Sequence, residues 1–412
     1  MSDRTYYTIE SQPVIQWVKA KNATIVDSGG REYIDFSSGC LIANSGHGNS
    51  SVQKAISSCN EAGLLCTYGF DNPWKEPLCS LLAELSPHQD PAMHLLSTGS
   101  EAVEFALKVS LIGHTSRSPE KPTVVSFRNG FHGRTLGAQY AGGSASLKSW
   151  IPSSPYQTII LDYPQSDFEL ARMLEQINSN HVAAIIFEPY IGGTVEIFEP
   201  KMLTTLRDYC TKVGALLIAD EVQSGCYRTG HMFFSCRSGV VPDIIVMGKG
   251  VSSSVPLSVV LLEERLLKKS GLNTVSSTHG GNAMACAAGL ANLEYLINED
   301  IGKKVKDDGA ILAREMNSIN DMFPHVTIRG VGMVYGIEFQ SPETASEIVE
   351  NAIQDGVLLF NAVGPTQSTI KICPPLTIEK INLEKGLKIF KKAIINTLKN
   401  REYDAHEWFG SY

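Results

Sequence analysis

The sequence of 412 residues has no long hydrophobic run. None of its apolar stretches approaches the ~18–20 residues that a membrane-spanning helix requires, so we expect no membrane partner. The first residues, 1–7, also lack the basic and then apolar layout of a secretory signal peptide. An excess of positive charge is missing as well. The formal net charge is −8, which argues against nucleic acid as a partner.

Paired cysteines are a further absence. The nine cysteines are widely scattered and form no Cys-x-x-Cys motif. This pattern is typical of reduced thiols rather than of disulfides or a zinc site, so we expect a cytoplasmic protein without a metal centre. There is no internal repeat and no tract dominated by one residue type. The length allows two or three folding units.

What the sequence does contain is a set of short apolar runs that end in chemically useful residues. Three of them are followed directly by Glu188, Asp220 and Lys249, respectively. Between the first two runs, apolar residues recur at three- and four-residue steps and predict a helix over 202–213. Strand, helix and strand in this order indicate a parallel sheet, in which ligands bind outside the carboxyl ends of the strands. The three runs are residues 182–187, 215–219 and 244–247.

The rest of the chain extends this pattern. Further strands are predicted at 93–96, 123–127 and 256–262, and the segment 23–36 is typical of a β-hairpin. After about residue 300, charged amphipathic helices alternate with short strands. We predict an α/β fold with a mostly parallel central sheet flanked by helices, plus a smaller α+β domain from both ends of the chain. The predicted boundaries are 1–50 and 301–412 for the small domain and 51–300 for the large one.

The turn Thr98-Gly99-Ser100 opens a predicted helix. Thr98 and Glu101 have the spacing of a capping box. A glycine-containing turn that begins a helix exposes free N–H groups at the positive end of the helix dipole, which favours a phosphate. The alternative is an ordinary capped helix without a ligand.

Phe131 and His132 follow the strand at 123–127 and are flanked by glycines, which leave room for a flat group. Together with the turn at 98–100, Asp220 and Lys249, they form a set that suits pyridoxal 5′-phosphate (PLP). The phosphate needs N–H donors and hydroxyls, and the ring needs an aromatic face. The pyridine nitrogen needs a carboxylate that keeps it protonated, and the aldehyde needs an amine.

At this point the chain resembles a known family, the class III aminotransferases of the fold type I PLP enzymes, over nearly its whole length. The resemblance rests on an ordered series of motifs. They are Thr98 to Ala102 with Lys108, Phe131 to Thr135, Glu188-Pro189, Leu217 to Gln223 with Arg228 to Gly230, Pro242-Asp243, Gly248 to Gly250, Thr278 to Asn282, and Lys371 to Leu376.

The resemblance implies that Lys249 forms the Schiff base with the cofactor and then moves a proton as general base and acid. It implies that Asp220 pairs with the pyridine nitrogen and that Gln223 bonds the ring hydroxyl. Without the resemblance, Asp220 reads as a turn cap and Lys249 as a solvated surface charge.

The remaining cofactor contacts are also implied by the resemblance. Phe131 or His132 covers one face of the ring, and Thr98, Gly99 and Ser100 hold the phosphate. Thr278 reaches the phosphate of the neighbouring subunit. The protein is therefore expected to be a homodimer with its sites at the interface.

The sequence departs from the family in one loop. Relatives that act on ω-amino acids often read Glu-Pro-x-Gln-x-Glu, whereas this chain has Ile191 and Gly193 at the last two defined positions. An arginine that commonly pairs with the lost glutamate is replaced by Lys371, which binds a carboxylate as a point charge rather than a fork. Arg134 is a second candidate carboxylate anchor, or it forms a structural ion pair with Glu188. These changes favour a roomier and less charged pocket.

The predicted function is that of an aminotransferase with a ping-pong mechanism. An amine or amino acid donates nitrogen to the cofactor, and a keto acid or aldehyde accepts it. The candidate substrate-binding residues are Arg134, Lys371 and Glu188. One alternative is an epimerase, racemase or decarboxylating enzyme of the same fold, since these share the motifs. A non-catalytic PLP-binding protein is another, although Lys249 and Asp220 are both retained.

Overall fold

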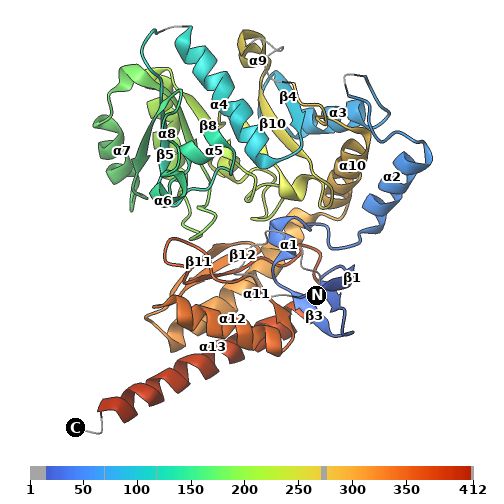
Figure 1. The fold of residues 1–412 in the computed structure, drawn as a ribbon, viewed down its shortest axis with the longest axis vertical. Coiled ribbons are helices and arrows are strands. Elements are labelled where there is room, and N and C mark those ends of the chain that lie inside the picture. The colour runs from blue at the N-terminus through green and yellow to red at the C-terminus, as the bar shows by residue number, and fades with distance from the viewer. Residues whose placement is uncertain (1–14, 69, 117, 271–275, 410–412) are drawn as a thin grey trace.

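The computed structural model describes residues 15–68, 70–116, 118–270 and 276–409 and shows the predicted α/β fold (Figure 1). One part of it is built on a seven-stranded sheet with the order β4-β10-β9-β8-β7-β5-β6. The pairs among β5 to β9 are parallel, whereas β10 is antiparallel to both of its neighbours, β4 and β9. The strands are β4 (Pro91–Leu96), β5 (Thr123–Phe127), β6 (Gln157–Leu161), β7 (Val182–Phe187), β8 (Leu216–Asp220), β9 (Ile244–Met247) and β10 (Ser258–Glu263).

Helices cover both faces of this sheet and make a three-layer arrangement (Figure 1). One face packs against α4, α5 and α9, and the other against α3, α7, α8 and α10. The helices are α2 (Ser50–Glu61), α3 (Lys75–Leu85), α4 (Gly99–Thr115), α5 (Leu136–Ala141), α6 (Ala145–Lys148), α7 (Asp167–Glu175), α8 (Pro200–Val213), α9 (Glu264–Ser270) and α10 (Ala283–Asn298).

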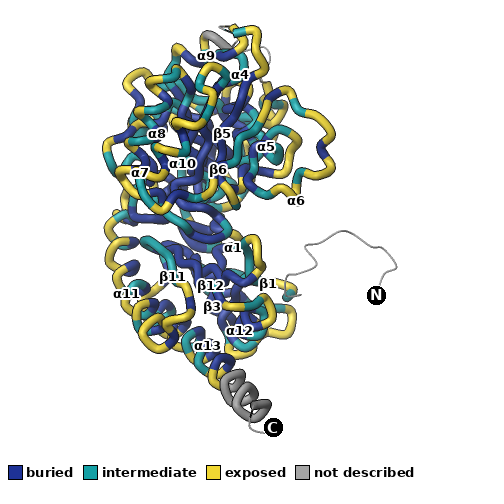
Figure 2. The backbone as a smooth tube through the Cα atoms, turned by 90° about the vertical axis from the view of Figure 1, so that its left-hand side faces the viewer, coloured by how far each residue is buried: buried dark blue, intermediate teal, exposed yellow. Residues whose placement is uncertain are grey.

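Burial on both faces explains why the central strands read as unbroken apolar runs. Ile186 and Ile218 face the α4 side, and their neighbours Ile185 and Leu217 face the α8 side. All six residues of β7, all four of β9 and all five of β5 are buried, and Figure 2 shows the tube at β5 in dark blue inside the molecule. The strand ends that carry the candidate site are therefore held by a rigid, densely packed layer.

The helix predicted between the first two apolar runs is confirmed as α8. Pro200 occupies its first turn, where the missing N–H has no intrahelical partner to lose. Met202, Leu206 and Cys210 are among the residues it buries on one face. Gly214 ends it in the left-handed conformation, with φ of 72°. This helix returns the chain to the amino edge of the sheet, so that β8 runs parallel to β7.

The second part of the fold combines both ends of the chain, as predicted. The hairpin β2–β3 is confirmed, and β3 pairs in parallel with β13. The domain boundaries at residues 50 and 300 remain our proposal. The elements of this part are β1 (Trp17–Lys21), β2 (Thr24–Asp27), β3 (Glu32–Asp35), α11 (Ile301–Met322), β11 (Thr327–Val331), β12 (Val334–Glu338), α12 (Pro342–Gln354), β13 (Val357–Leu358), β14 (Thr369–Ile372) and α13 (Lys380–Phe409).

A buried arginine joins the two parts. Arg228 has no solvent exposure, and its guanidinium donates to the carbonyl oxygens of Met333 and Pro374 and to the side-chain oxygens of Ser38 and Asn44. Ser38 begins a short turn, α1 (Ser38–Leu41), in which all four residues have positive φ. Such a left-handed turn is costly for residues other than glycine and persists only where its surroundings hold it.

In the ranges given above, no helix is both long enough and apolar enough to cross a membrane. All nine cysteines lie in these ranges and are free thiols.

Candidate active site

The three strand ends singled out from the sequence meet in one cavity. Asp220 is the last residue of β8, Glu188 directly follows β7, and Lys249 opens the short 3-10 helix η3 (Lys249–Val251) after β9. All three line a cavity of about 160 Å³ at the carboxyl edge of the sheet. The complete lining is Gly99, Ser100, Phe131, His132, Gly133, Glu188, Asp220, Val222, Gln223 and Lys249.

Asp220 is held as a buried acceptor. Its side chain is 4% exposed, and the Nδ1–H of His132 donates to its Oδ2 over 2.8 Å. The backbone N–H of Val222 donates to Oδ1 over 3.2 Å. These two contacts fix the plane of the carboxylate and leave lone pairs free for a further donor. His132 is therefore fixed at the bottom of the cavity by Asp220, beside the predicted ring site.

The turn predicted at residues 98–100 is confirmed as the start of α4, and its binding of a phosphate stays a prediction. Thr98 is its N-cap and forms the predicted capping box with Glu101. The Thr98 hydroxyl is used in this cap, and Thr98 is absent from the cavity lining. Gly99 and Ser100 do line the cavity, and as the first two residues of a helix their N–H groups have no intrahelical acceptor. The anion site that the geometry offers is thus centred on these two residues.

The backbone at Lys249 is strained. Its φ is 44°, in the left-handed region that residues other than glycine rarely adopt. Residues held in such a conformation cluster at functional sites, because the surrounding structure must enforce it. The short helix η3 and the packed strand β9 provide that enforcement, so the lysine is fixed at its base.

Two apolar side chains belong to the cavity lining. Phe131 is 40% exposed, and Val222 lines the cavity as well. Sequence reasoning missed Val222, although its position two residues after Asp220 was a usable signal. Gly133 approaches Ser100 so closely that a Cβ atom there would lie 2.4 Å from the Ser100 Oγ. The glycine after His132 is therefore required for the phosphate turn and the aromatic loop to meet.

Glu188 is buried beneath the cavity and bound by the backbone. Its Oε2 accepts from the Phe131 N–H over 2.9 Å, and its Oε1 accepts from the Gly192 N–H over 3.2 Å. The pKa of Glu188 is raised to about 7, mainly by burial; the charge of Asp220 adds to the rise, whereas His132 and the two backbone N–H groups oppose it. Of the two roles considered for Arg134, the ion pair with Glu188 is not formed. The Arg134 guanidinium lies over the Phe131 ring, 5.1 Å from its centroid.

Gln223 and Lys371 lie together. The Lys371 Nζ donates to the Gln223 Oε1 over 3.0 Å and to the Gly192 carbonyl over 2.9 Å. The Gln223 Nε2 in turn contacts the Glu188 Oε1 at 3.4 Å. Burial lowers the pKa of Lys371. The loop that departs from the family pattern is thus in direct contact with Lys371.

Thr278 lies outside this cavity. It is exposed and does not belong to the cavity lining of its own chain. The predicted contact with the phosphate of a second subunit remains a prediction.

These residues fit PLP. The cavity combines an amine at Lys249, a buried carboxylate at Asp220 and a helix N-terminus at Gly99 and Ser100. Phe131 and Val222 add apolar side chains to its lining. Each group matches one chemical requirement of the cofactor.

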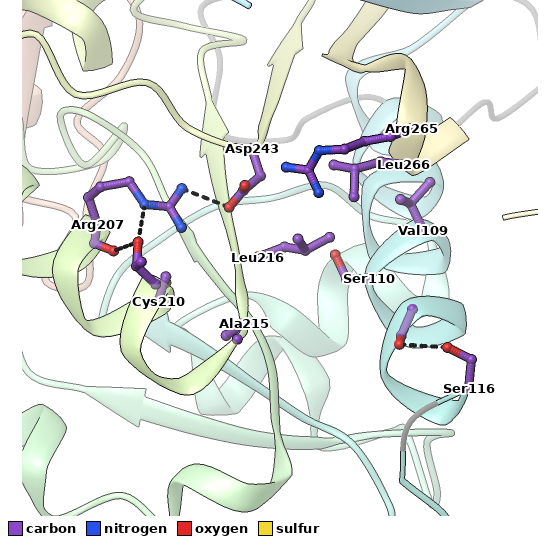
Figure 3. Close-up of a pocket in the computed structure, with 13 residues that line it drawn as sticks. Val109, Ser110, Ser116, Arg207, Cys210, Ala215, Leu216, Asp243, Arg265 and Leu266 are labelled. Atoms are coloured by element: carbon purple, nitrogen blue, oxygen red, sulfur yellow. Dashed lines mark hydrogen bonds and ion pairs between the residues drawn. The ribbon is translucent and has the colours of Figure 1, made fainter. Parts of the chain in front are cut away.

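A larger cavity of about 720 Å³ lies at the opposite edge of the sheet, between α4, α8 and α9 (Figure 3). Arg207 donates to Asp243 there, and Arg265 points toward the same space. None of the predicted site residues lines it. The carboxyl-terminal ends of α4 and α8 border it, and their negative dipole ends offset the positive charge of the arginines. Size alone therefore does not identify the active site.

The comparisons with known proteins agree with the geometry. A family model described as aminotransferase class-III matches residues 6–394. The 2-aminoadipate transaminase of Pseudomonas putida is 32% identical over 91% of this chain and 94% of its own length. The diaminobutyrate–2-oxoglutarate transaminase of Wolinella succinogenes is 32% identical over 98% of this chain and 96% of its own.

Solved structures give the same result. An ornithine aminotransferase from Toxoplasma gondii, described with partial occupancy of PLP, is 27% identical. Its TM-score is 0.86, with 96% of this chain and 94% of that chain covered. An amine transaminase from an uncultivated Pseudomonas species in its PLP-bound form is 25% identical, with a TM-score of 0.88 and coverage of 96% and 99%. The family resemblance and the fold predicted from the sequence are thereby confirmed, and this chain belongs to the class III aminotransferases, the PLP-dependent transaminases of fold type I.

Proposed function

We propose that this aminotransferase binds PLP in the cavity between β7, β8 and β9, with Lys249 as the residue that holds it covalently. The observation that carries the proposal is the meeting of Lys249 and the buried Asp220–His132 pair at adjacent strand ends. When bound, PLP supplies an electron sink that stabilises negative charge on the substrate carbon. The other cofactor roles belong to the residues of this chain.

Asp220 keeps the pyridine nitrogen protonated, because it is a buried carboxylate whose orientation His132 fixes. Gly99 and Ser100 bind the phosphate through their N–H groups at the start of α4. Phe131 and Val222 exclude water from the ring. Lys249 Nζ takes the proton that leaves the nitrogen-bearing carbon of the substrate and returns it afterwards, as general base and then acid.

The donor is an amino acid or amine, and the acceptor a 2-oxo acid or an aldehyde. Relatives named for diaminobutyrate, acetylornithine and putrescine support a donor with a primary amine at the end of a carbon chain. The relative named for diaminobutyrate and 2-oxoglutarate supports a 2-oxo acid as acceptor. Arg134 is exposed and lies beside Phe131, which lines the cavity, and it is the carboxylate anchor that we favour for these substrates.

We also propose a homodimer in the cytoplasm. Thr278 is exposed and lies outside the cavity of its own chain, which is the placement expected of a residue that serves a partner's phosphate. The exposed apolar side chains of Leu65, Tyr68 and Phe70 lie within one short segment and support a surface that another copy covers. Nine free thiols favour a reducing compartment.

Borohydride reduction of the PLP-loaded protein, followed by peptide mass spectrometry, tests the central assignment. We expect the cofactor to be trapped on Lys249 and not in the Lys249→Ala variant. Trapping at another lysine, or none, would refute the proposal. Incubation with donor alone then separates the reactions. An aminotransferase accumulates the aminated cofactor, whereas an epimerase or racemase inverts its substrate without accumulating it.

A further inference from the structure

A buried chain of three side chains runs from the small sheet into the cavity. Lys371 on β14 donates to the Gln223 Oε1 over 3.0 Å, and the Gln223 Nε2 lies 3.4 Å from the Glu188 Oε1. Two of the three side chains, Gln223 and Glu188, line the cavity. Lys371 is absent from that lining. The lysine thus lies behind Gln223 with respect to the cofactor site.

The contacts of Lys371 are to the protein itself. Its ammonium has three N–H groups, and two of them are used by the Gln223 side chain and the Gly192 carbonyl. The residue is only 9% exposed. Gly192 is fixed in turn, because its own N–H donates to Glu188. A substrate carboxylate would have to displace these contacts in order to use the lysine as its anchor.

We infer that Lys371 is a positioning residue that fixes the orientation of the Gln223 amide, rather than an anchor for the substrate carboxylate. The inference rests on the proposed function, because it concerns what Gln223 presents to bound PLP.

The two ends of the amide face chemically different neighbours. Lys371 has only donors, so it requires the amide oxygen. The Glu188 Oε1 already accepts from the Gly192 N–H, and in the ionised form of Glu188 it can only accept, so it requires the NH₂ group. A flipped amide would place the NH₂ group against the ammonium and the oxygen against the carboxylate, and both contacts would be lost. Amide orientation is assigned from such contacts, and here both neighbours select the same one.

This orientation determines what the cavity receives. The NH₂ group has two N–H bonds, and Glu188 takes one of them. Gln223 therefore offers the cavity an N–H donor instead of an acceptor. A donor stabilises the anionic form of the cofactor ring oxygen, so the bound cofactor should lose its proton at a lower pH than it would without Lys371.

The test is a pH titration of the visible absorbance of PLP-loaded protein. Lys371→Met keeps the length of the side chain but removes the donors. We expect its titration midpoint to rise by about one pH unit, the size that one charge-assisted hydrogen bond gives. Lys371→Arg keeps N–H donors at this position and should restore most of the shift. An unchanged midpoint in Lys371→Met would overturn the inference.

Kinetics with 2,4-diaminobutyrate, a donor with a terminal primary amine, separate the two roles of Lys371. If Lys371 acts by positioning Gln223, Lys371→Met lowers kcat and moves the absorbance midpoint, with little change in KM. A raised KM with an unmoved midpoint means that the lysine contacts the substrate, and the inference then falls. If Lys371→Met does not fold, Gln223→Glu replaces it. The carboxylate introduced at position 223 still accepts from Lys371 but has no N–H to donate to the cofactor. An unchanged titration midpoint in this variant would also overturn the inference.

Failure of this inference is distinguishable from failure of the proposed function. Without PLP trapped on Lys249, both fall together. With PLP trapped on Lys249 and amino transfer observed, an unmoved midpoint removes only the positioning role of Lys371.

Discussion

A single methyl group at position 192 should disrupt the buried contacts beneath the cavity. A Cβ atom on Gly192 would lie 2.0 Å from the Gln223 Nε2 and 2.8 Å from the Glu188 Oε1. Ordinary contacts of a Cβ atom begin at 3.4 Å, so Gly192→Ala must displace the Gln223 amide by more than a small relaxation. The contacts of that amide with Lys371 and Glu188 would both be broken.

The expected loss follows from these contacts. Two buried, charged groups would each lose a hydrogen-bond partner, and we expect the free energy of unfolding to fall by about 2–4 kcal/mol. The measurement is urea denaturation of the cofactor-free protein, with the linear extrapolation compared between variants. In the PLP-loaded protein, the absorbance midpoint should rise as it does in Lys371→Met.

The neighbouring glycine provides a matched control. A Cβ atom on Gly193 would lie 3.4 Å from the Gly364 Cα, which is ordinary contact distance. Gly193→Ala should therefore change the stability by less than about 1 kcal/mol and leave the absorbance midpoint in place. Equal destabilisation by the two substitutions would show that the loop, and not the Gln223 amide, determines the effect.

Three other predictions have defined outcomes, the first of them with a paired control. Gly214→Ala places a side chain at the left-handed end of α8 and should lower the free energy of unfolding by about 1–2 kcal/mol, measured by thermal or urea unfolding. Its control is Gly113→Ala, inside α4 with open space around the Cβ position, which should leave that free energy unchanged or raise it by up to about 1 kcal/mol. Arg228→Met leaves four buried acceptors without their donor and should lower the free energy of unfolding by about 3–5 kcal/mol in the same measurement. A decrease of less than about 1 kcal/mol would contradict the role of Arg228 in joining the two parts of the fold. The third concerns Glu188, whose native pKa of about 7 lies above the ordinary value of 4.5. The native state therefore binds this proton more tightly than the unfolded state, and as pH rises from about 5 to about 8 the carboxyl reduces the unfolding free energy by up to about 3 kcal/mol. Urea denaturation at about pH 5 and about pH 8 should show a smaller fall in the unfolding free energy for Glu188→Gln than for the unmodified protein. An identical fall in both proteins would contradict the raised pKa of Glu188.

The strand ends of the site could be predicted because buried parallel strands are apolar without interruption. The apolar runs before Asp220 and before Lys249 contain no polar residue, so the first polar residue after each run marks the end of a strand. The same reasoning predicted α8, whose proline and glycine mark both ends. These features depend on local sequence alone.

Other features depend on contacts that local sequence does not contain. The strand β6 was missed because it lies at the sheet edge, begins at the exposed Gln157 and is only partly buried. Nothing in residues 258–263 reveals that β10 runs against its neighbours, since the direction is set by the path of the chain between strands. The ion pair considered for Arg134, which is not formed, came from pairing charges without the backbone: the Phe131 N–H donates to one oxygen of Glu188.

The parallel pairing of β3 with β13 has a consequence for synthesis of the protein on the ribosome. Ile34 pairs with Val357, so the hairpin at the start of the chain must wait for nearly the whole polypeptide before its outer strand is covered. During that time the edge of β3 is open to pairing with other nascent chains. The seven strands of the central sheet all precede residue 264 and can assemble earlier. Weaker induction, with fewer initiations per unit time, should therefore favour soluble protein, because it reduces the number of chains that wait in this half-finished state at the same time.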